Sequence, residues 1–147
     1  MASTTRKHEP RRYVHGAASS RSSTDRQDPR VIVLFVALAG AGGVLARYGL
    51  SSLVHSAALP WMTVGINVLG SFLLGVLIVA HGTSPHVRTI LGVGFLGGFT
   101  TFSTFTVQVF LDAEAGAAGR GALLLLVSVA AGLAAAAGGY YLGKAAF

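Results

Sequence analysis

Four long apolar segments, separated by short polar stretches, dominate the chain after residue 30. They cover residues 31–50, 61–80, 89–111 and 121–142. Each is close to the roughly 20 residues that an α-helix needs to cross a hydrocarbon core of about 30 Å. A helix on the surface of a soluble bundle would carry charged residues along one face, and these segments do not. The pattern predicts an all-α integral membrane protein with four transmembrane helices.

The stretches between these segments are short. Pro60 precedes Trp61, whose amphipathic ring suits a membrane interface. Residues 81–88 have the composition of a turn, and residues 112–120 contain the only acidic residues beyond residue 30. These connections leave no room for a domain outside the membrane. Four short helices also enclose little volume, so we expect a transport path to need a second subunit.

The N-terminal 30 residues have a different composition from the rest. They contain seven of the eleven lysines and arginines, namely Arg6, Lys7, Arg11, Arg12, Arg21, Arg26 and Arg30. They have almost no aliphatic side chains, so folding would bury too little apolar surface to offset the loss of chain entropy. We therefore expect residues 1–30 to be a disordered basic tail and residues 31–147 to be the membrane domain. No folded basic face is visible, and no nucleic-acid partner is expected.

The third segment contains an unusual run at residues 97–105, GGFTTFSTF. Non-helical backbone is tolerated in a membrane only where it is buried in protein or faces water. We expect the third helix to be broken at Gly97 and Gly98, which would free the carbonyls of residues 97–100 to hold a hard cation such as Na⁺. The alternative is an unbroken but kinked packing helix, whose hydroxyls bond to its own carbonyls.

Three further features of the spans need a partner or a function. Phe102 and Phe105 lie three apart and so share a helix face, and the positive edge of a phenyl ring can meet a small anion. Asn67 sits within the second segment, where its amide either faces a polar path or bonds to another helix. Arg47 lies near the end of the first segment, where it either faces such a path or extends to the interface.

These motifs together resemble the Fluc/CrcB family of fluoride channels. The resemblance rests on GGFTTFSTF at residues 97–105, INVLGSFLLG at residues 66–75 and GGVLARY at residues 42–48, which occur in the family's order. It covers residues 31–147 and leaves only the tail outside. It implies a dimer of two subunits in antiparallel, inverted orientation, with two fluoride pores and a central Na⁺.

The resemblance also implies roles for individual residues. The backbone carbonyls of Gly97 and Thr100 in each subunit would hold the Na⁺, and Arg47 would lie beside the aqueous vestibule. The residues expected along the fluoride pore are Asn67, Phe102, Thr104, Phe105 and Ser128. In the fourth helix the family often reads Tyr-x3-Ser-x3-Gly. Ser128 and Gly132 fit this pattern, but Leu124 stands where the tyrosine would be, which is a departure from the family at a pore position.

The function implied is a fluoride-specific channel in the plasma membrane that allows passive, electrogenic efflux of F⁻ from the cytoplasm. A small multidrug-type four-helix exporter is one alternative, but proton-coupled export needs a carboxylate within a span. A non-transporting membrane assembly protein is the other, and it leaves Asn67 and the two phenylalanines unexplained. With no cysteine and no carboxylate at membrane depth, the sequence does not indicate an enzyme.

Charge placement predicts the orientation. The tail, the loop with Arg88, and Lys144 would lie on one side and hold nine lysines and arginines, against only Arg47 and Arg120 on the other. The positive-inside rule therefore favours both termini in the cytoplasm. A chain fixed in one orientation cannot supply its own inverted mate, so a heterodimer with a paralogue is favoured over a homodimer that inserts both ways.

Overall fold

The computed structural model describes residues 28–147. The expected basic tail therefore lies almost entirely outside the described residues, and only its last three positions can be compared. These positions begin the first helix instead of preceding it. The Asp28 carboxylate accepts a hydrogen bond from the Arg30 N–H at 3.0 Å, and Pro29 occupies the first helical turn, where its missing N–H costs nothing.

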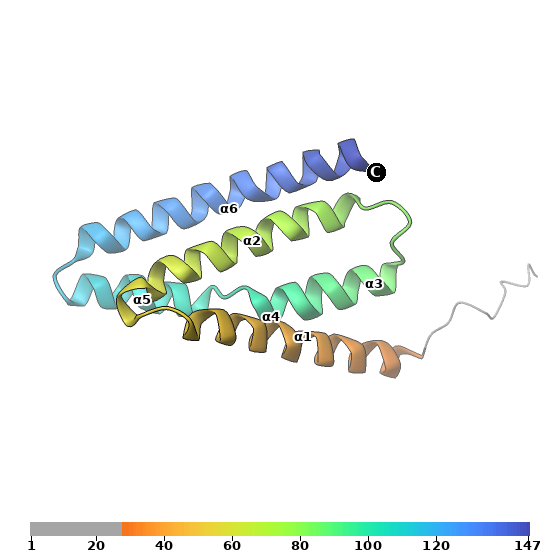
Figure 1. The fold of residues 1–147 in the computed structure, drawn as a ribbon, viewed down its shortest axis with the longest axis horizontal. Helices are drawn as coiled ribbons and strands as arrows, with labels where there is room; N and C mark the ends of the chain where they lie inside the picture. The colour runs from red at the N-terminus through yellow and green to blue at the C-terminus, as the bar shows by residue number, and fades with distance from the viewer. Residues whose placement is uncertain (1–27) are drawn as a thin grey trace, which may run out of the picture.

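The described chain is built from helices throughout (Figure 1). The first two spans are α1 (Pro29–Ser52) and α2 (Leu59–Val79), joined by a 3₁₀ turn at Ser56–Ala58. The third is composite and consists of α3 (Pro85–Thr89), a π-helical segment (Ile90–Leu96), α4 (Gly97–Phe99) and α5 (Ser103–Glu114). The fourth is α6 (Ala118–Ala146). Four helical stretches in the described chain are long and apolar enough to cross a membrane, and the chain is a multi-pass membrane protein.

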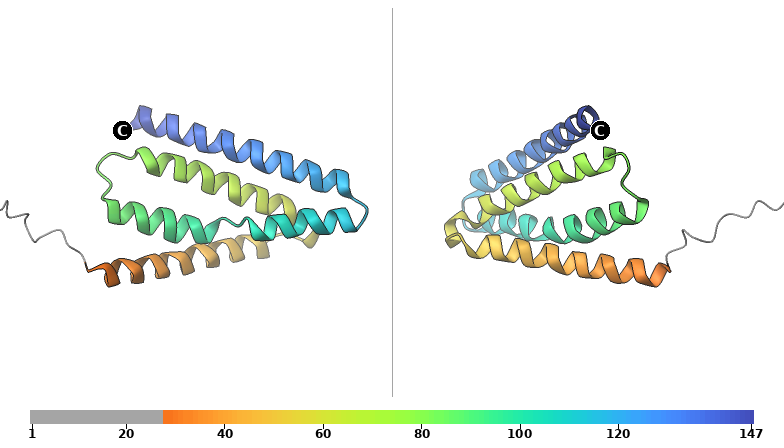
Figure 2. Two further views of the ribbon diagram at one scale, coloured as in Figure 1. Left: turned by 180° about the vertical axis from the view of Figure 1, so that it is seen from behind. Right: turned by 45° about the vertical axis from the view of Figure 1, so that its right-hand side comes forward.

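The four spans run up and down in a bundle, so that the start of α1 and the end of α6 lie at the same end (Figures 1 and 2). Helices α2 and α6 lie side by side along most of their length. The first half of the third span packs against α1, whereas α5 packs against α6. The third span thus links α1 to the α2–α6 pair, and its two halves have different neighbours.

Glycines set the contact between α2 and α6. A β-carbon at Gly75 would overlap the backbone of Ala136, one at Gly139 would overlap the backbone of Phe72, and one at Gly143 would overlap the Val79 side chain. Only hydrogen at these positions allows the two backbones to approach so closely. Gly139 and Gly143, four residues apart on α6, are therefore both positions of close helix packing.

A second glycine contact joins α1 to the third span. A β-carbon at Gly94 would lie 2.8 Å from the Val36 carbonyl oxygen, and one at Gly98 would overlap the Gly40 backbone. Gly94 and Gly98, also four residues apart, therefore allow the third span to approach α1 closely.

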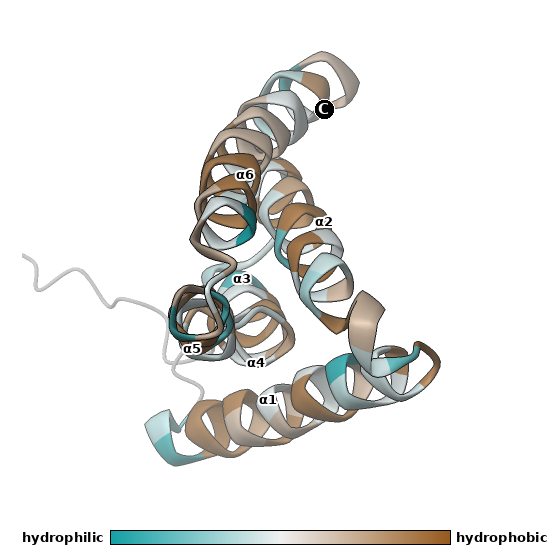
Figure 3. Cartoon of the chain, turned by 90° about the vertical axis from the view of Figure 1, so that its left-hand side faces the viewer, coloured by the Kyte–Doolittle hydropathy of each residue, from teal (hydrophilic) through white to brown (hydrophobic). Residues whose placement is uncertain are grey.

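Most large apolar side chains of the described chain are exposed, and apolar residues recur along the helices (Figure 3). The buried apolar cluster is small and consists of Val64, Phe105 and Leu124, with Val68, Val109 and Val127 packed against it. Water would make such a surface costly, whereas lipid solvates it. The distribution is that of a bundle surrounded by lipid.

The loop that follows α5 is shorter than the sequence suggested. Asp112 was expected in that loop but lies in the last turns of α5, because the helix continues to Glu114 and turns only at Gly116, which has a φ of 78°. Asp112 is 7% exposed and pairs with Arg120, with Oδ2 and Nε 3.6 Å apart. The carboxylate is therefore at the end of a span and not in its middle.

Candidate functional site

The third span is interrupted three residues later than its glycines suggested. Gly97 and Gly98 are helical, with φ −63° and ψ −36° at Gly97, and the prediction of a break at these two residues is wrong in position. The backbone becomes extended at Thr100, with φ −81° and ψ 156°, and helix resumes at Ser103. Gly98 is needed for contact with α1 and has no reason to leave the helix.

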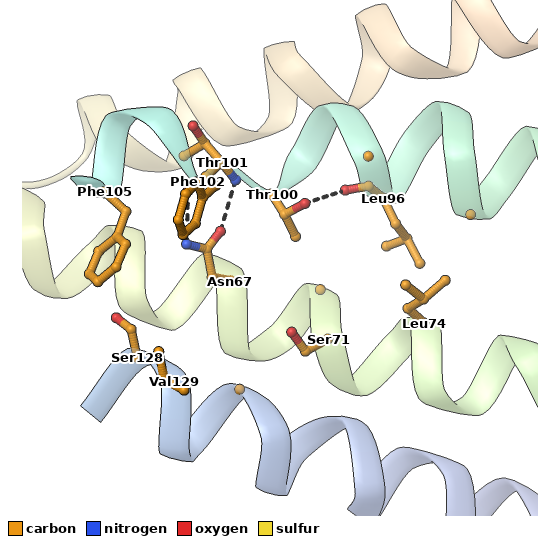
Figure 4. Close-up of a pocket in the computed structure, with 14 residues that line it drawn as sticks. Asn67, Ser71, Leu74, Leu96, Thr100, Thr101, Phe102, Phe105, Ser128 and Val129 are labelled. Carbon is orange, nitrogen blue, oxygen red and sulfur yellow. Dashed lines mark hydrogen bonds between the residues drawn. The ribbon is translucent and has the colours of Figure 1, made fainter. Parts of the chain in front are cut away.

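Asn67 of α2 bridges the interruption. Its Oδ1 accepts a hydrogen bond from the Thr101 N–H at 2.8 Å, and its Nδ2 donates to the Thr101 carbonyl at 3.0 Å (Figure 4). One side-chain amide thus replaces both hydrogen bonds that Thr101 would make in a continuous helix. Unpaired backbone groups at membrane depth cost several kcal/mol, so this pair makes the interruption tolerable.

The hydroxyl of Thr101 is hydrogen-bonded to the first turn of α5, which forms the second half of the span. Its Oγ1 accepts a hydrogen bond from the Thr104 N–H at 3.3 Å and lies 3.1 Å from the Thr104 hydroxyl oxygen. This arrangement caps the first turn of α5. Thr104, expected along the pore, is exposed on the described chain and does not line the groove described below.

Arg47 lies on the opposite side of the interruption, against α4. Its Nε–H donates to the Gly98 carbonyl at 3.4 Å, and the side chain is half-buried. A cation beside the carbonyl end of a helix segment is electrostatically favourable. Arg47 does not line the groove described below, and its contact in the described chain is with the broken span itself.

A groove of about 320 Å³ opens beside the interruption, between α2, the third span and α6 (Figure 4). Its lining joins three helices that the sequence separates widely. The polar residues that line it are Asn67, Ser71, Thr100, Thr101 and Ser128, and the aromatic ones are Phe102 and Phe105. Gly97 also lines it. Of the residues predicted for the cation and pore sites, only Thr104 is missing from this groove.

The two phenylalanines lie in different environments. Phe105 is 4% exposed and belongs to the buried apolar cluster, whereas Phe102 is 75% exposed. Their ring centroids are 6.4 Å apart, with the planes tilted by 50°, so one ring presents its edge near the other. The Phe102 ring is thus a large apolar surface left uncovered by the described chain.

Ser128 faces Phe105 from α6 (Figure 4). Its Oγ is buried and has no hydrogen-bond partner within residues 28–147. A buried hydroxyl usually has a partner, so this one is available to a ligand. Leu124, where the family often has tyrosine, is 1% exposed and packs against Val64 and Phe105. At this position the chain has apolar packing in place of a hydroxyl.

Sequence reasoning missed two residues of this site. The backbone of Thr101 is hydrogen-bonded to the Asn67 side chain, and nothing in the sequence distinguished Thr101 from its hydroxyl neighbours. Ser71 lies one helical turn after Asn67, and the four-residue spacing alone would have placed both on one face of α2.

Comparison with known proteins identifies the family. The family described as "CrcB-like protein, Camphor Resistance (CrcB)" matches residues 34–140. The chain belongs to the CrcB-like family. The matched range includes Arg47, Asn67 and the interrupted third span.

The chain aligns with individual CrcB-like relatives along most of their length. The chain is 43% identical over 118 residues to a "Fluoride-specific ion channel FluC" of Thermus thermophilus, with 76% of this chain and 94% of the relative covered. A protein of the same name from Beijerinckia indica subsp. indica is 45% identical over 114 residues, with 71% and 86% covered. Another, from Geobacter sulfurreducens, is 42% identical over 105 residues, with 67% and 85% covered.

Proposed function

We propose that this chain is a subunit of a fluoride-specific ion channel that lets F⁻ leave the cytoplasm passively. The observation that carries the proposal is the groove at the interrupted span, where the Phe102 and Phe105 rings lie beside the unpartnered Ser128 hydroxyl. The names of the relatives support the choice of ion. Inside-negative voltage would drive the efflux at about 2.3 kcal/mol per 100 mV, and the flow requires no catalytic residue.

The groove suits a small, strongly hydrated anion. Fluoride loses water on entering a narrow path, so the path must supply hydrogen-bond donors and positive ring edges in its place. The Ser128 hydroxyl is free to donate, and the Asn67 amide has a second N–H beyond the one held by Thr101. A path fitted to F⁻ would exclude the larger chloride ion by size.

The interruption also fits the expected Na⁺. In a continuous helix, the N–H groups of Thr101 and Thr104 would bond to the carbonyls of Gly97 and Thr100. Here they donate instead to side chains, of Asn67 and Thr101 respectively, which leaves both carbonyls free. Carbonyl oxygen is a ligand that hard cations prefer. A bound Na⁺ would supply fixed positive potential near the anion path.

Two carbonyls are too few to hold a cation, so the site requires a second subunit. In our proposal an inverted partner contributes the same two oxygens, and it also covers Phe102. Na⁺ is then a structural ion of the dimer, and its site is formed only on assembly.

The partner and its orientation follow from the placement of charge. Of the described lysines and arginines, Arg30, Arg88 and Lys144 lie toward one end of the bundle and Arg47 and Arg120 toward the other. The sequence places six more in residues 1–27, ahead of the first span. The positive-inside rule then favours both termini in the cytoplasm of a plasma-membrane protein. The mate in our proposal is an oppositely oriented paralogue, whose own pore residues compensate for Leu124; a dual-topology homodimer is the other possibility.

Reporter fusions test this orientation. A C-terminal reporter active only in the cytoplasm should give a strong signal, and one active only outside should give none. Comparable signals from both reporters would show that the chain inserts both ways, and the obligate paralogue would then be wrong.

Ion flux tests the function itself. The chain is purified through its tag together with any subunit that accompanies it, and reconstituted into liposomes. We expect voltage-driven efflux of fluoride and not of chloride. Phe102→Ile keeps an apolar side chain but removes the ring edge, so flux should fall by about tenfold, which corresponds to a barrier about 1.4 kcal/mol higher.

The same assay separates the alternatives. A proton-coupled exporter would need a carboxylate along the path, and Asp112 is instead ion-paired at the end of α5. An assembly protein would give no flux. Proton-dependent transport of organic cations, or the absence of fluoride flux from the intact complex, would refute the proposal.

A further inference from the structure

A second pocket lies at the end of the bundle where α1 begins and α6 ends (Figure 1). It has a volume of about 360 Å³ and lies between the ends of α2 and α6 and the loop and helix that follow α2. The residues that line it are Ile78, Val79, His81, Arg88, Tyr140 and Lys144. It shares no residue with the groove at the interrupted span.

The two cations of this pocket have no carboxylate partner in the described part of the chain, where the ion pair found is that of Arg120 with Asp112. Arg88 is held in place by its Nη2, which donates to the Ala80 carbonyl at 3.2 Å. Lys144 is held over the Tyr140 ring, with Nζ 5.7 Å from the ring centroid. Both charged groups are therefore positioned, and neither is neutralised.

The α2 side of the pocket is apolar and firmly built, and His81 adds a further polar side chain to the lining. Ile78 and Val79 form one wall at the end of α2. Gly143, one residue before Lys144, packs against Val79 so closely that a β-carbon would overlap it. The α2 and α6 walls of the pocket are thus fixed by the tight contact between these two helices.

We propose that this pocket binds the phosphate group of an anionic phospholipid. Two positioned cations favour a phosphate, and Arg presents several N–H donors to its oxygens. A lipid fits better than free phosphate because the apolar wall continues onto lipid-facing side chains, with Ile78 and Leu142 exposed. Basic pockets between transmembrane helices are a known setting for anionic headgroups. The proposal does not depend on fluoride conduction.

The proposal is tested by native mass spectrometry, which measures the lipids that stay bound to the protein. The full chain, with any accompanying subunit, is prepared in a mixture of phosphatidylglycerol and phosphatidylcholine. We expect preferential retention of phosphatidylglycerol. Arg88→Gln and Lys144→Gln should each lower this preference by about fivefold, the effect of one cation near a membrane surface. Arg88→Lys keeps the positive charge and should retain most of the preference for phosphatidylglycerol. That result would exclude a simple folding defect.

Arg30→Gln is the matched control, because Arg30 carries the same charge at the same end of the bundle but lies outside the pocket. It should leave the preference unchanged. An equal loss in Arg30→Gln would mean that surface charge alone attracts the lipid, and the pocket would have no role. Displacement of phosphatidylglycerol by excess inorganic phosphate would assign the pocket to a soluble ligand and overturn the choice of a lipid.

Discussion

Closely spaced glycines occur both in the α2–α6 pair and in the third span. Helices α2 and α6 are nevertheless unbroken, whereas the third span is interrupted. Gly75 and Gly139 stay helical because each receives the backbone of the facing helix. Gly97 and Gly98 stay helical as well, and the interruption falls just beyond them. Glycine therefore permits close packing in both regions and does not itself end the helix.

The difference lies in side chains that compete for backbone hydrogen bonds. At Thr101, the Asn67 amide offers both an acceptor and a donor from a neighbouring helix. The Thr101 hydroxyl then takes the Thr104 N–H. In the described chain no side chain from another helix bonds to the backbone of α2 or α6, where the one side-chain bond is that of the Thr63 hydroxyl to the Leu59 carbonyl within α2. A helix in lipid is interrupted where substitute partners are supplied, and not only where the chain is flexible.

The largest effect is expected in the α2–α6 contact. Gly139→Val would drive a side chain into the Phe72 backbone, so we expect a loss of about 3 kcal/mol or more. Gly138→Val is the matched control, because no atom lies within 4 Å of its β-carbon position. Thermal denaturation in detergent, followed by size-exclusion chromatography, measures both. Equal stability of the two variants would show that the close contact is not needed.

The next comparison separates the two glycines at the interruption. Gly98→Ala would overlap the Gly40 backbone and should cost about 2 kcal/mol. At Gly97 a β-carbon would lie 3.7 Å from the nearest atom, the Gly92 carbonyl oxygen, and the backbone is already helical. Gly97→Ala should therefore be neutral or stabilise by up to about 1 kcal/mol. A reversed order of melting temperatures would place the critical contact at Gly97.

These two glycines show what the sequence can and cannot reveal. The length and polarity of the segments were enough to predict four membrane helices, since lipid imposes both. An interruption near residue 100 was also predictable, because Gly, Thr and Ser accumulate there. Its position was not, because it depends on which residue of the third span faces Asn67, and that register is set by packing across helices.

In the candidate site, too, some residues could be identified from the sequence and some contacts could not. Asn67, Phe102, Phe105 and Ser128 were identified from the sequence through family motifs, and the structure brings them to one groove. The contact of Arg47 with the Gly98 carbonyl spans 51 residues and depends on how α1 crosses α4. Spacing along the chain carries no information about such a contact.

An effect on stability comparable to that of Gly98→Ala is expected from Asn67→Ala, which removes both hydrogen bonds to Thr101. At about 1 kcal/mol for each bond, the expected loss is roughly 2 kcal/mol. The Thr101 amide should also exchange with deuterium faster, which mass spectrometry of the peptide containing it would measure. Ser71→Ala, one turn later on α2, is the control and should leave that exchange rate unchanged. Protection of Thr101 that survives in Asn67→Ala would mean that the interruption is stable without the amide.

The smallest effect on stability is expected at Ser128, where the direction of the change in stability is the informative result. Its Oγ is buried without a partner in the described chain, so the folded protein already carries the cost of removing that hydroxyl from water. Ser128→Ala should therefore leave stability unchanged or raise it by up to about 1 kcal/mol, while fluoride flux in liposomes falls. Thr63→Val is a suitable control, because it removes a hydroxyl that donates within α2 to the Leu59 carbonyl, away from the groove. It should lower stability slightly and leave flux intact. If Ser128→Ala loses stability but keeps its flux, the hydroxyl serves packing or an unseen hydrogen bond, and the path of the ion must be sought elsewhere in the groove.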